Sequence, residues 1–239
     1  MAGRAAGPGR AALWWRALGL ALAASLAFAA QAQTAPTAQE AARYTGLHAA
    51  AWSGNVAQID RLLAARADPN LRDGHGRTPL HVATFARQRG AIDALARGGA
   101  ELGALENDRY DAVTIAAVAD DEVTLALLLQ LGASAKLVTS RYDGTALIAA
   151  AHLGHDGVVR QLIQAGAPLD HVNNLHWTAL IESIVLGNGG PRHLATLTLL
   201  VEAGANTQLA DRQGQTPLAL ARSRGYAPMV QILLQAGAR

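Results

Sequence analysis

Residues 73–83, with the sequence DGHGRTPLHVA, decide the fold of this chain. Thr78 suits a helix N-terminus, because its hydroxyl accepts one of the unpaired backbone N–H groups found there. Pro79 follows at the first helical position, where no N–H is needed. Leu80 and Ala83 lie three residues apart and therefore share one face of the predicted helix. The stretch predicts a turn that leads directly into a half-buried helix.

The pattern recurs at a nearly constant step. Residues able to cap a helix fall at six positions, called capping positions below, with steps of 33, 33, 34, 33 and 38 residues: Thr45, Thr78, Asp111, Thr145, Thr178 and Thr216. Gly-Ala pairs keep the same step and begin at Gly99, Gly132, Gly166, Gly204 and Gly237, while Arg66 takes the glycine's place in the first unit. An apolar pair precedes each of these sites. Such a period indicates stacked units that complete one another's core.

Residues Thr78, Pro79, Leu80, His81 and Ala83 match the T-P-L-H-x-A signature, and the chain from about Tyr44 onward resembles an ankyrin-repeat domain. The resemblance implies an all-α solenoid of six helix–turn–helix repeats joined by β-hairpin-like loops. It also implies that a protein partner docks on the concave face. The repeats are expected at about 40–72, 73–105, 106–138, 139–172, 173–210 and 211–239.

Residues 1–32 are typical of a secretory signal peptide. They contain three arginines and no acidic residue, an apolar run at 17–30, and small residues at 30 and 32. We expect cleavage after Ala32, a polar tether at 33–39, and a periplasmic location, which the alanine-rich leader and the lack of cysteine favour. An uncleaved membrane anchor is the alternative, but the apolar run is shorter than the ~20 residues that a transmembrane helix needs.

The composition removes several classes of function. With no cysteine, disulfides, thiolate chemistry, cysteine-ligated zinc and a lipoprotein anchor are excluded. The formal charge of +2 comes from the leader, because removing its three arginines leaves 17 basic (20 minus 3) and 18 acidic residues. A nucleic-acid partner is therefore not expected. The chain also lacks the G-x-S-x-G and H-E-x-x-H motifs of hydrolytic enzymes.

Several repeats depart from the pattern. Arg66 is expected to adopt a left-handed backbone with modest strain, or else to end its helix differently. In the fourth repeat Gly144 lies next to the capping residue, which predicts a reshaped hairpin at 140–143. His176 stands where the turn glycine of the fifth repeat is expected. Five added residues at 187–192 predict an exposed loop between the two helices of that repeat. At the C-terminal end, polar residues such as Arg222 and Gln231 are expected to supply part of a cap.

Six of the seven aromatic residues that follow the leader fall at or beside positions that an ankyrin stack presents on its concave face. These positions come one residue before, or seven residues after, a capping position. We predict a protein-binding stripe with a polar rim, made of Tyr44, Trp52, Arg77, Phe85, Asp108, Tyr110, Arg141, Tyr142, His152, Trp177 and Arg212. Aromatic residues are enriched at protein interfaces. The alternative is that each ring covers its neighbouring hairpin and seals the seam between two repeats.

The histidines have two interpretations. His48 and His81 belong to the signature itself, in which the imidazole tends to bond across hairpins, so both are expected to be structural. His152, His155 and Asp156 are clustered and form a candidate metal site, although Gly154 separates the two histidines and a closed site needs four ligands. His155 also fits the usual histidine position that follows the glycine in this family.

The sequence thus predicts a secreted, non-enzymatic ankyrin scaffold that binds a protein partner and no cofactor, nucleic acid or, after cleavage, membrane. A monomer is expected, although the C-terminal end offers a surface on which another copy could stack. One alternative is an enzyme or metal-dependent protein using His152, His155 and Asp156. Another is an accessory factor of a periplasmic oxidative-stress enzyme, because some bacterial periplasmic ankyrin proteins resemble partners of catalase-type enzymes.

Overall fold

The computed structural model describes residues 33–239 of the chain. Residues Ala35–Arg239 form one compact unit. The predicted signal peptide and its cleavage site lie outside the described residues. Among the helices of residues 33–239, none combines the length and the apolar character needed to cross a bilayer.

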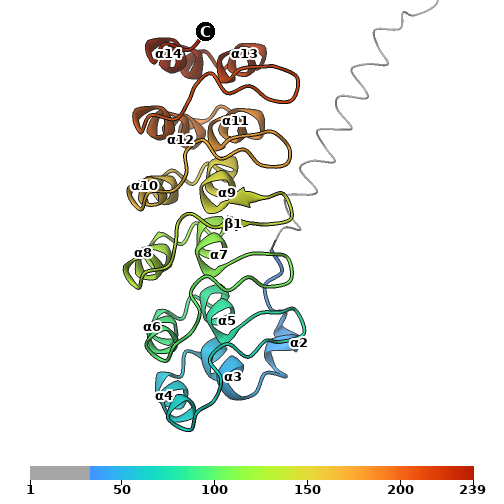
Figure 1. Cartoon of the computed structure of the whole chain (residues 1–239), viewed down its shortest axis with the longest axis vertical. Coiled ribbons are helices and arrows are strands. Elements are labelled where there is room, and N and C mark those ends of the chain that lie inside the picture. Colours follow the sequence, from blue (N-terminus) through green and yellow to red (C-terminus); the bar gives the residue numbers. More distant parts are fainter. Residues whose placement is uncertain (1–32) are drawn as a thin grey trace, which may run out of the picture. The chain divides into compact units, whose positions relative to one another are not determined.

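Twelve of the thirteen helices in residues 33–239 form six consecutive pairs (Figure 1). The first, inner helix of each pair follows a capping position, and the second, outer helix returns alongside it. The pairs are α3 (Gly46–Ser53) with α4 (Val56–Ala64), α5 (Pro79–Phe85) with α6 (Arg89–Arg97), α7 (Ala112–Val118) with α8 (Glu122–Gln130), α9 (Ala146–Leu153) with α10 (Asp156–Gln164), α11 (Ala179–Val185) with α12 (Pro191–Glu202), and α13 (Pro217–Ser223) with α14 (Ala227–Gln235). This confirms the predicted all-α repeat architecture.

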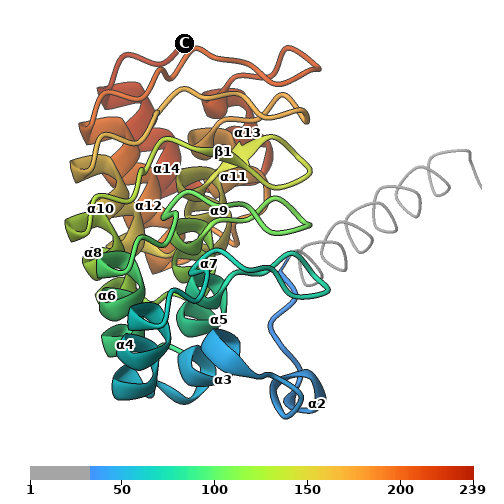
Figure 2. The same cartoon turned by 60° about the horizontal axis from the view of Figure 1, so that its bottom comes forward.

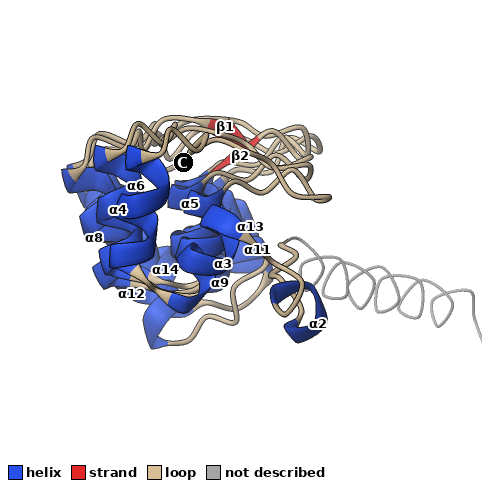
Figure 3. Cartoon of the chain, turned by 90° about the horizontal axis from the view of Figure 1, so that it is seen from below, coloured by secondary structure: helices blue, strands red, loops and turns tan. Residues whose placement is uncertain are grey.

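Within residues 35–239 the pairs stack in chain order, with inner helices in one layer and outer helices in another (Figures 2 and 3). The loops that join successive pairs lie on one side of these layers (Figure 3). Stacking is close because a small residue stands five positions after every capping position: Ala50, Ala83, Ala116, Ala150, Ser183 and Ala221, all of them buried. Small side chains let neighbouring helices approach, since the side chains at the contact set the interaxial distance. One continuous core results, and it runs from Leu47 in α3 to Leu233 in α14.

The helix ends confirm the capping pattern. The side chain of Asp111 accepts a hydrogen bond from the backbone N–H of Thr114 at 2.9 Å, and those of Thr145, Thr178 and Thr216 accept equivalent bonds at 3.2–3.3 Å. Each satisfies one unpaired donor of its helix. Thr45 makes no such side-chain bond.

The left-handed positions also follow the repeat. The glycine of each Gly-Ala pair has a φ between 76° and 95°, and Arg66 occupies the same position with a φ of 63°. Arg109 and His176 take the place of the turn glycine with φ values of 67° and 64°. A non-glycine residue pays a steric cost there, because its Cβ approaches the backbone.

The fourth hairpin differs from the others, as predicted. Two short antiparallel strands, β1 (Val138–Thr139) and β2 (Gly144–Thr145), pair across it. Ser140 and Asp143 both have positive φ values at the turn between them. The extra residue of this repeat is thereby absorbed into a small ladder.

Two predictions about local structure are corrected. The segment 33–39 is not wholly an irregular tether, because helix α2 (Ala38–Ala41) begins within it. Thr37 and Glu40 form a reciprocal capping box around this helix, a T-x-x-E pattern visible in the sequence. The segment 187–192 is not simply an exposed loop, because α12 already begins at Pro191 and Gly187 is buried. The added residues lengthen α12 to 12 residues, whereas α10 and α14 have 9.

The strain at position 66 yields a stability prediction. We expect Arg66→Gly to raise the free energy of unfolding by about 0.5–1 kcal/mol, since glycine removes the left-handed penalty but adds some chain entropy. Gly99→Ala is the matched control: open space surrounds a Cβ there, so its φ of +91° alone predicts a loss of about 1 kcal/mol. Urea denaturation measures both. Destabilisation by Arg66→Gly would contradict the assignment of strain.

Candidate protein-binding face

The concave face is defined here as the side of residues 35–239 lined by the inner helices and the hairpin loops. In α5, α7 and α11 every residue is buried except the last. The half-buried residues seven positions after the capping positions form one row along this face: Trp52, Phe85, Val118, His152 and Val185. The row is apolar except for His152, and Leu153, the last residue of α9, is exposed as well.

Two residues of the predicted stripe are not accessible. Tyr110 is 5% exposed and Arg77 is 1% exposed, so the prediction that they line the binding surface is wrong for the free protein. Arg77 is enclosed because its Nε donates to Asp73 at 2.7 Å and its Nη2 donates to Glu40 at 3.1 Å. Burial raises the pKa of Tyr110 to about 12. For Tyr110 the alternative interpretation, a ring that seals a seam, agrees with the structure.

The remaining aromatic residues are half-buried: Tyr44, Trp52, Phe85, Tyr142 and Trp177. The Tyr44 hydroxyl donates to Asp73 at 2.8 Å, and its ring lies 5.4 Å from that of His48. The rings therefore present part of their surface while they cover their own repeat.

The predicted polar rim consists largely of charges paired with each other. Arg141 reaches Asp108 at 2.6 Å, and Arg109 reaches Asp143 at 2.9 Å, so two ion pairs join the α6–α7 and α8–α9 loops. Arg212 donates to the carbonyl oxygen of Asn174 at 2.9 Å. These side chains fix neighbouring loops to one another.

Backbone hydrogen bonds reinforce this coupling. The N–H groups of Asn107, Ser140 and Asn174 donate to carbonyl oxygens of the preceding loop at 2.9–3.0 Å. Four successive loops are thereby joined along the same edge, which makes the rim a rigid, sheet-like margin.

Sequence reasoning missed the residues that shape each loop. Five positions before a capping position, one side chain accepts two backbone N–H groups of its own loop; these residues are Asp73, Glu106, Ser140, Asn173 and Asp211. Asp, Asn and Ser favour turns for this reason. Their constant spacing from the capping positions is a signal in the sequence that would have found them.

The signature histidines are structural, as expected. The Nε2 atoms of His48 and His81 lie 2.9 and 3.1 Å from the carbonyl oxygens of Arg77 and Tyr110, each in the next loop. The Nδ1 atom of His81 also accepts the backbone N–H of Thr78 at 3.1 Å. Burial lowers the pKa of His81 to about 4, so it stays neutral and keeps this acceptor.

The candidate metal ligands are not brought together. His155 Nδ1 lies 2.9 Å from the carbonyl oxygen of Ala117, Asp156 pairs with Arg192 at 3.0 Å, and His152 faces Glu182 at 3.4 Å. Within residues 33–239, His, Asp and Glu form no group of three or more suited to a metal ion.

Glu182 is an acidic residue in an otherwise apolar position. It lies four residues after its capping position, where the other repeats have Ala49, Val82, Ile115, Ala149 and Leu220. Its Oε1 accepts the Asn173 side chain at 3.0 Å, while Oε2 has no hydrogen bond and lies 3.4 Å from His152 Nδ1. Burial raises the pKa of Glu182 to about 8, against a smaller opposite effect of Asn173. Burial, followed by His193 and His155, lowers the pKa of His152. Burial thus favours the neutral form of both groups.

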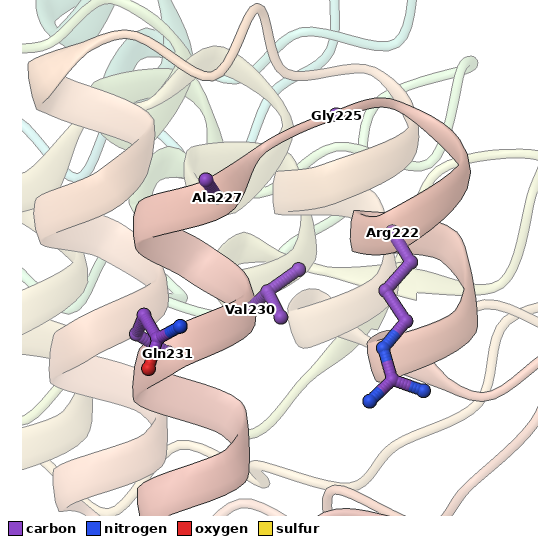
Figure 4. A pocket seen from close by; sticks show the side chains of 5 residues that line it. All are labelled: Arg222, Gly225, Ala227, Val230 and Gln231. Atoms are coloured by element: carbon purple, nitrogen blue, oxygen red, sulfur yellow. The ribbon is translucent and has the colours of Figure 1, made fainter.

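The C-terminal end of the stack carries an open hollow of about 230 Å³ (Figure 4). Arg222, Gly225, Ala227, Val230 and Gln231 line it. Arg222 is exposed at a position that holds buried residues in earlier repeats, Ala117 and Ile184 among them. A copy stacked here would bury this guanidinium, which is costly without a partner. The charge thus supports the predicted polar cap and disfavours stacking.

Comparison with known proteins decides the family. A model of three ankyrin repeats matches residues 47–141 and 113–211, and a single ankyrin-repeat model matches residues 213–239. The chain belongs to the ankyrin-repeat family. Ankyrin repeats are in general protein-binding scaffolds and are typically not catalytic.

Bacterial ankyrin proteins are among its relatives. It is 33% identical over 190 residues to the ankyrin repeat protein YahD of Escherichia coli (strain K12), a match that covers 79% of this chain and 94% of that protein. An ankyrin repeat domain from Acinetobacter baumannii superposes with a TM-score of 0.77 at 43% identity, covering 81% of this chain and 98% of that one. The ankyrin repeat domain of Bcl-3, a member of the IkappaB protein family, gives a TM-score of 0.73 at 28% identity over 82% and 88% of the two chains.

The buried carboxyl group predicts a pH dependence of stability. The pKa of Glu182 is about 8 in the folded protein and near its ordinary value of 4.5 in the unfolded chain. Between these values the unfolded chain releases a proton that the folded protein retains, so stability falls as pH rises from 5 to 8 and then levels off. We expect Glu182→Gln to stabilise the protein increasingly over this range, by as much as a few kcal/mol at pH 8. Thermal unfolding of both proteins measures the difference, and a difference independent of pH would contradict it.

Proposed function

We propose that this ankyrin-repeat protein binds a protein partner through its concave face in the bacterial cell envelope. The observation that carries the proposal is the half-buried row of Trp52, Phe85, Val118, His152 and Val185. Nearly every other residue of α5, α7 and α11 is buried, so the row offers a coherent apolar surface rather than scattered contacts.

Rigid display is the proposed mechanism of binding. The loops beside the row are tied together by the Arg141–Asp108 and Arg109–Asp143 pairs and by backbone hydrogen bonds. A preorganised surface loses little conformational freedom when a partner docks, so more of the interaction energy appears as affinity. Half-buried Tyr142 and Trp177 extend the surface toward the loop edge, and aromatic side chains are frequent anchors of interfaces.

Photocrosslinking tests the face directly. We expect a photoreactive phenylalanine analogue at Phe85 or Trp177 to capture the same protein in the native envelope, since both positions lie on the proposed surface. Val123, which is 61% exposed on the outer helix α8, provides the matched control and should capture nothing specific. Mass spectrometry of the crosslinked product identifies the partner.

Two results would contradict the proposal. Equal capture from Val123, or none from any of Trp52, Phe85 and Trp177, would show that this face does not bind. Trp177→Ala should weaken capture from Phe85 at least about tenfold if the two positions contact one partner, as expected for an interface anchor.

The envelope location rests on the leader. Its arginines, apolar run and small residues at 30 and 32 support export and cleavage. We expect protein purified from the periplasmic fraction to begin at Gln33, which intact-mass measurement determines. A protein that retains residues 1–32 in the membrane fraction would favour an anchor, and one in the cytoplasmic fraction would contradict export.

A further inference from the structure

Helix α2 precedes the first inner helix, α3. Figures 1 and 2 show it beside α3 and the α4–α5 loop, on the side of the inner helices away from the outer helices. Glu40 lies five residues before the capping position Thr45, the spacing at which later repeats have Asp73 or Asp211. In those repeats the carboxylate accepts hydrogen bonds from its own loop, whereas the Glu40 carboxylate contacts side chains of the next repeat.

The Glu40 carboxylate is shared among three residues. Its Oε2 accepts the N–H and the hydroxyl of Thr37 at 2.7 and 2.8 Å, and its Oε1 lies 2.7 Å from His75 Nε2 and 3.1 Å from Arg77 Nη2. The bonds from Thr37 and, after them, the Arg77 guanidinium lower the pKa of Glu40 to about 2, so the group is ionised at all physiological pH values. Charge-assisted bonds of this kind are among the stronger ones in proteins.

The donors of this site are held by the scaffold. Arg77 is positioned by Asp73, whose other contacts are the Tyr44 hydroxyl and two backbone N–H groups of the α4–α5 loop. His75 lies in the same loop, and its backbone carbonyl accepts the N–H of Asn107. The two donors are thus fixed by the second and third repeats rather than by α2.

The segment that supplies the carboxylate is weakly attached. None of the four residues of α2 is buried, and in the segment 35–43 only Pro36 is. Tyr44, which follows, is held by its hydroxyl bond to Asp73 and packs against the core. With so little apolar surface buried, the segment belongs to the parts of a protein that open at low energetic cost. When the segment opens, Arg77 and His75 lose the Glu40 carboxylate. A carboxylate of another molecule can then take its place.

We infer that His75 and Arg77 form a carboxylate-binding site on the concave face, which Glu40 occupies in the free protein and an acidic segment of the partner occupies on docking. The inference rests on the proposed function for the existence of a partner. It adds that the partner is acidic where it meets the second repeat, and that the N-terminal segment 35–43 is displaced.

A peptide competition tests the site without the partner. The receptor is the full chain carrying Glu40→Gln, whose own segment lacks the carboxylate. The probe is a fluorescein-labelled peptide with the sequence of residues 35–44, and the matched control peptide differs only by Glu40→Gln. We expect the acidic peptide to bind this receptor at least about tenfold more tightly than the control, the effect of one charged hydrogen-bonded contact. The wild-type chain, whose site is filled, should bind the acidic peptide at least about tenfold more weakly than the Glu40→Gln chain.

Equal affinity of the two peptides, equal affinity of the two receptors, or no binding of the acidic peptide would each overturn the inference. Circular dichroism confirms that the Glu40→Gln chain is folded. A second receptor carries His75→Ala in addition to Glu40→Gln. The substitution should leave the fold intact because the His75 side chain is 49% exposed, and this receptor should lose affinity for the acidic peptide. Because no partner is used, failed photocrosslinking would refute the proposed function without affecting this result.

Discussion

The close approach of neighbouring inner helices is the constraint on which the rest of the structure depends. Every repeat places a small, buried residue five positions after its capping position, such as Ala83, Ala116 and Ser183. A larger side chain there would separate the helices and open the core that two repeats share. No helix pair closes a core by itself, so each repeat is stable only because its neighbours cover it. The concave face inherits its regular spacing from this contact.

The two ends of the stack, which lack a neighbouring repeat, are covered in different ways. At the N-terminal end, α2 and the Glu40 carboxylate complete the polar groups of the second repeat, with almost no apolar burial. At the C-terminal end, Arg222 occupies a position that is buried in earlier repeats and leaves a hollow lined partly by polar side chains. The N-terminal end is therefore stabilised by ion pairs, whereas the C-terminal end is kept polar by solvated side chains. This difference is why the N-terminal end offers a replaceable contact and the C-terminal end does not favour further stacking.

The concave face combines a rim of interconnected loops with the row of half-buried, mostly apolar residues. Ion pairs such as Arg141–Asp108 are exposed and contribute little to stability by themselves. Their effect here is geometric, because they hold the loops in register beside Trp52, Phe85 and the half-buried residues that follow. The same charges are engaged within the protein, so a partner gains most from the apolar row and from groups such as His75 that remain partly exposed.

The sequence by itself determined the repeats, the capping residues and the structural role of His81. Each of these follows from local chemistry repeated at a fixed period, and local chemistry is visible in a single chain. Only the tertiary structure decided that Arg77 and Tyr110 are enclosed while Phe85 and Trp177 stay partly open. All four occupy positions that the repeat presents on one face, but exposure depends on what a neighbouring loop or the N-terminal segment places over them. The same holds for Glu182: the sequence shows an acidic residue, whereas its burial, which raises its pKa, is a property of the folded chain alone.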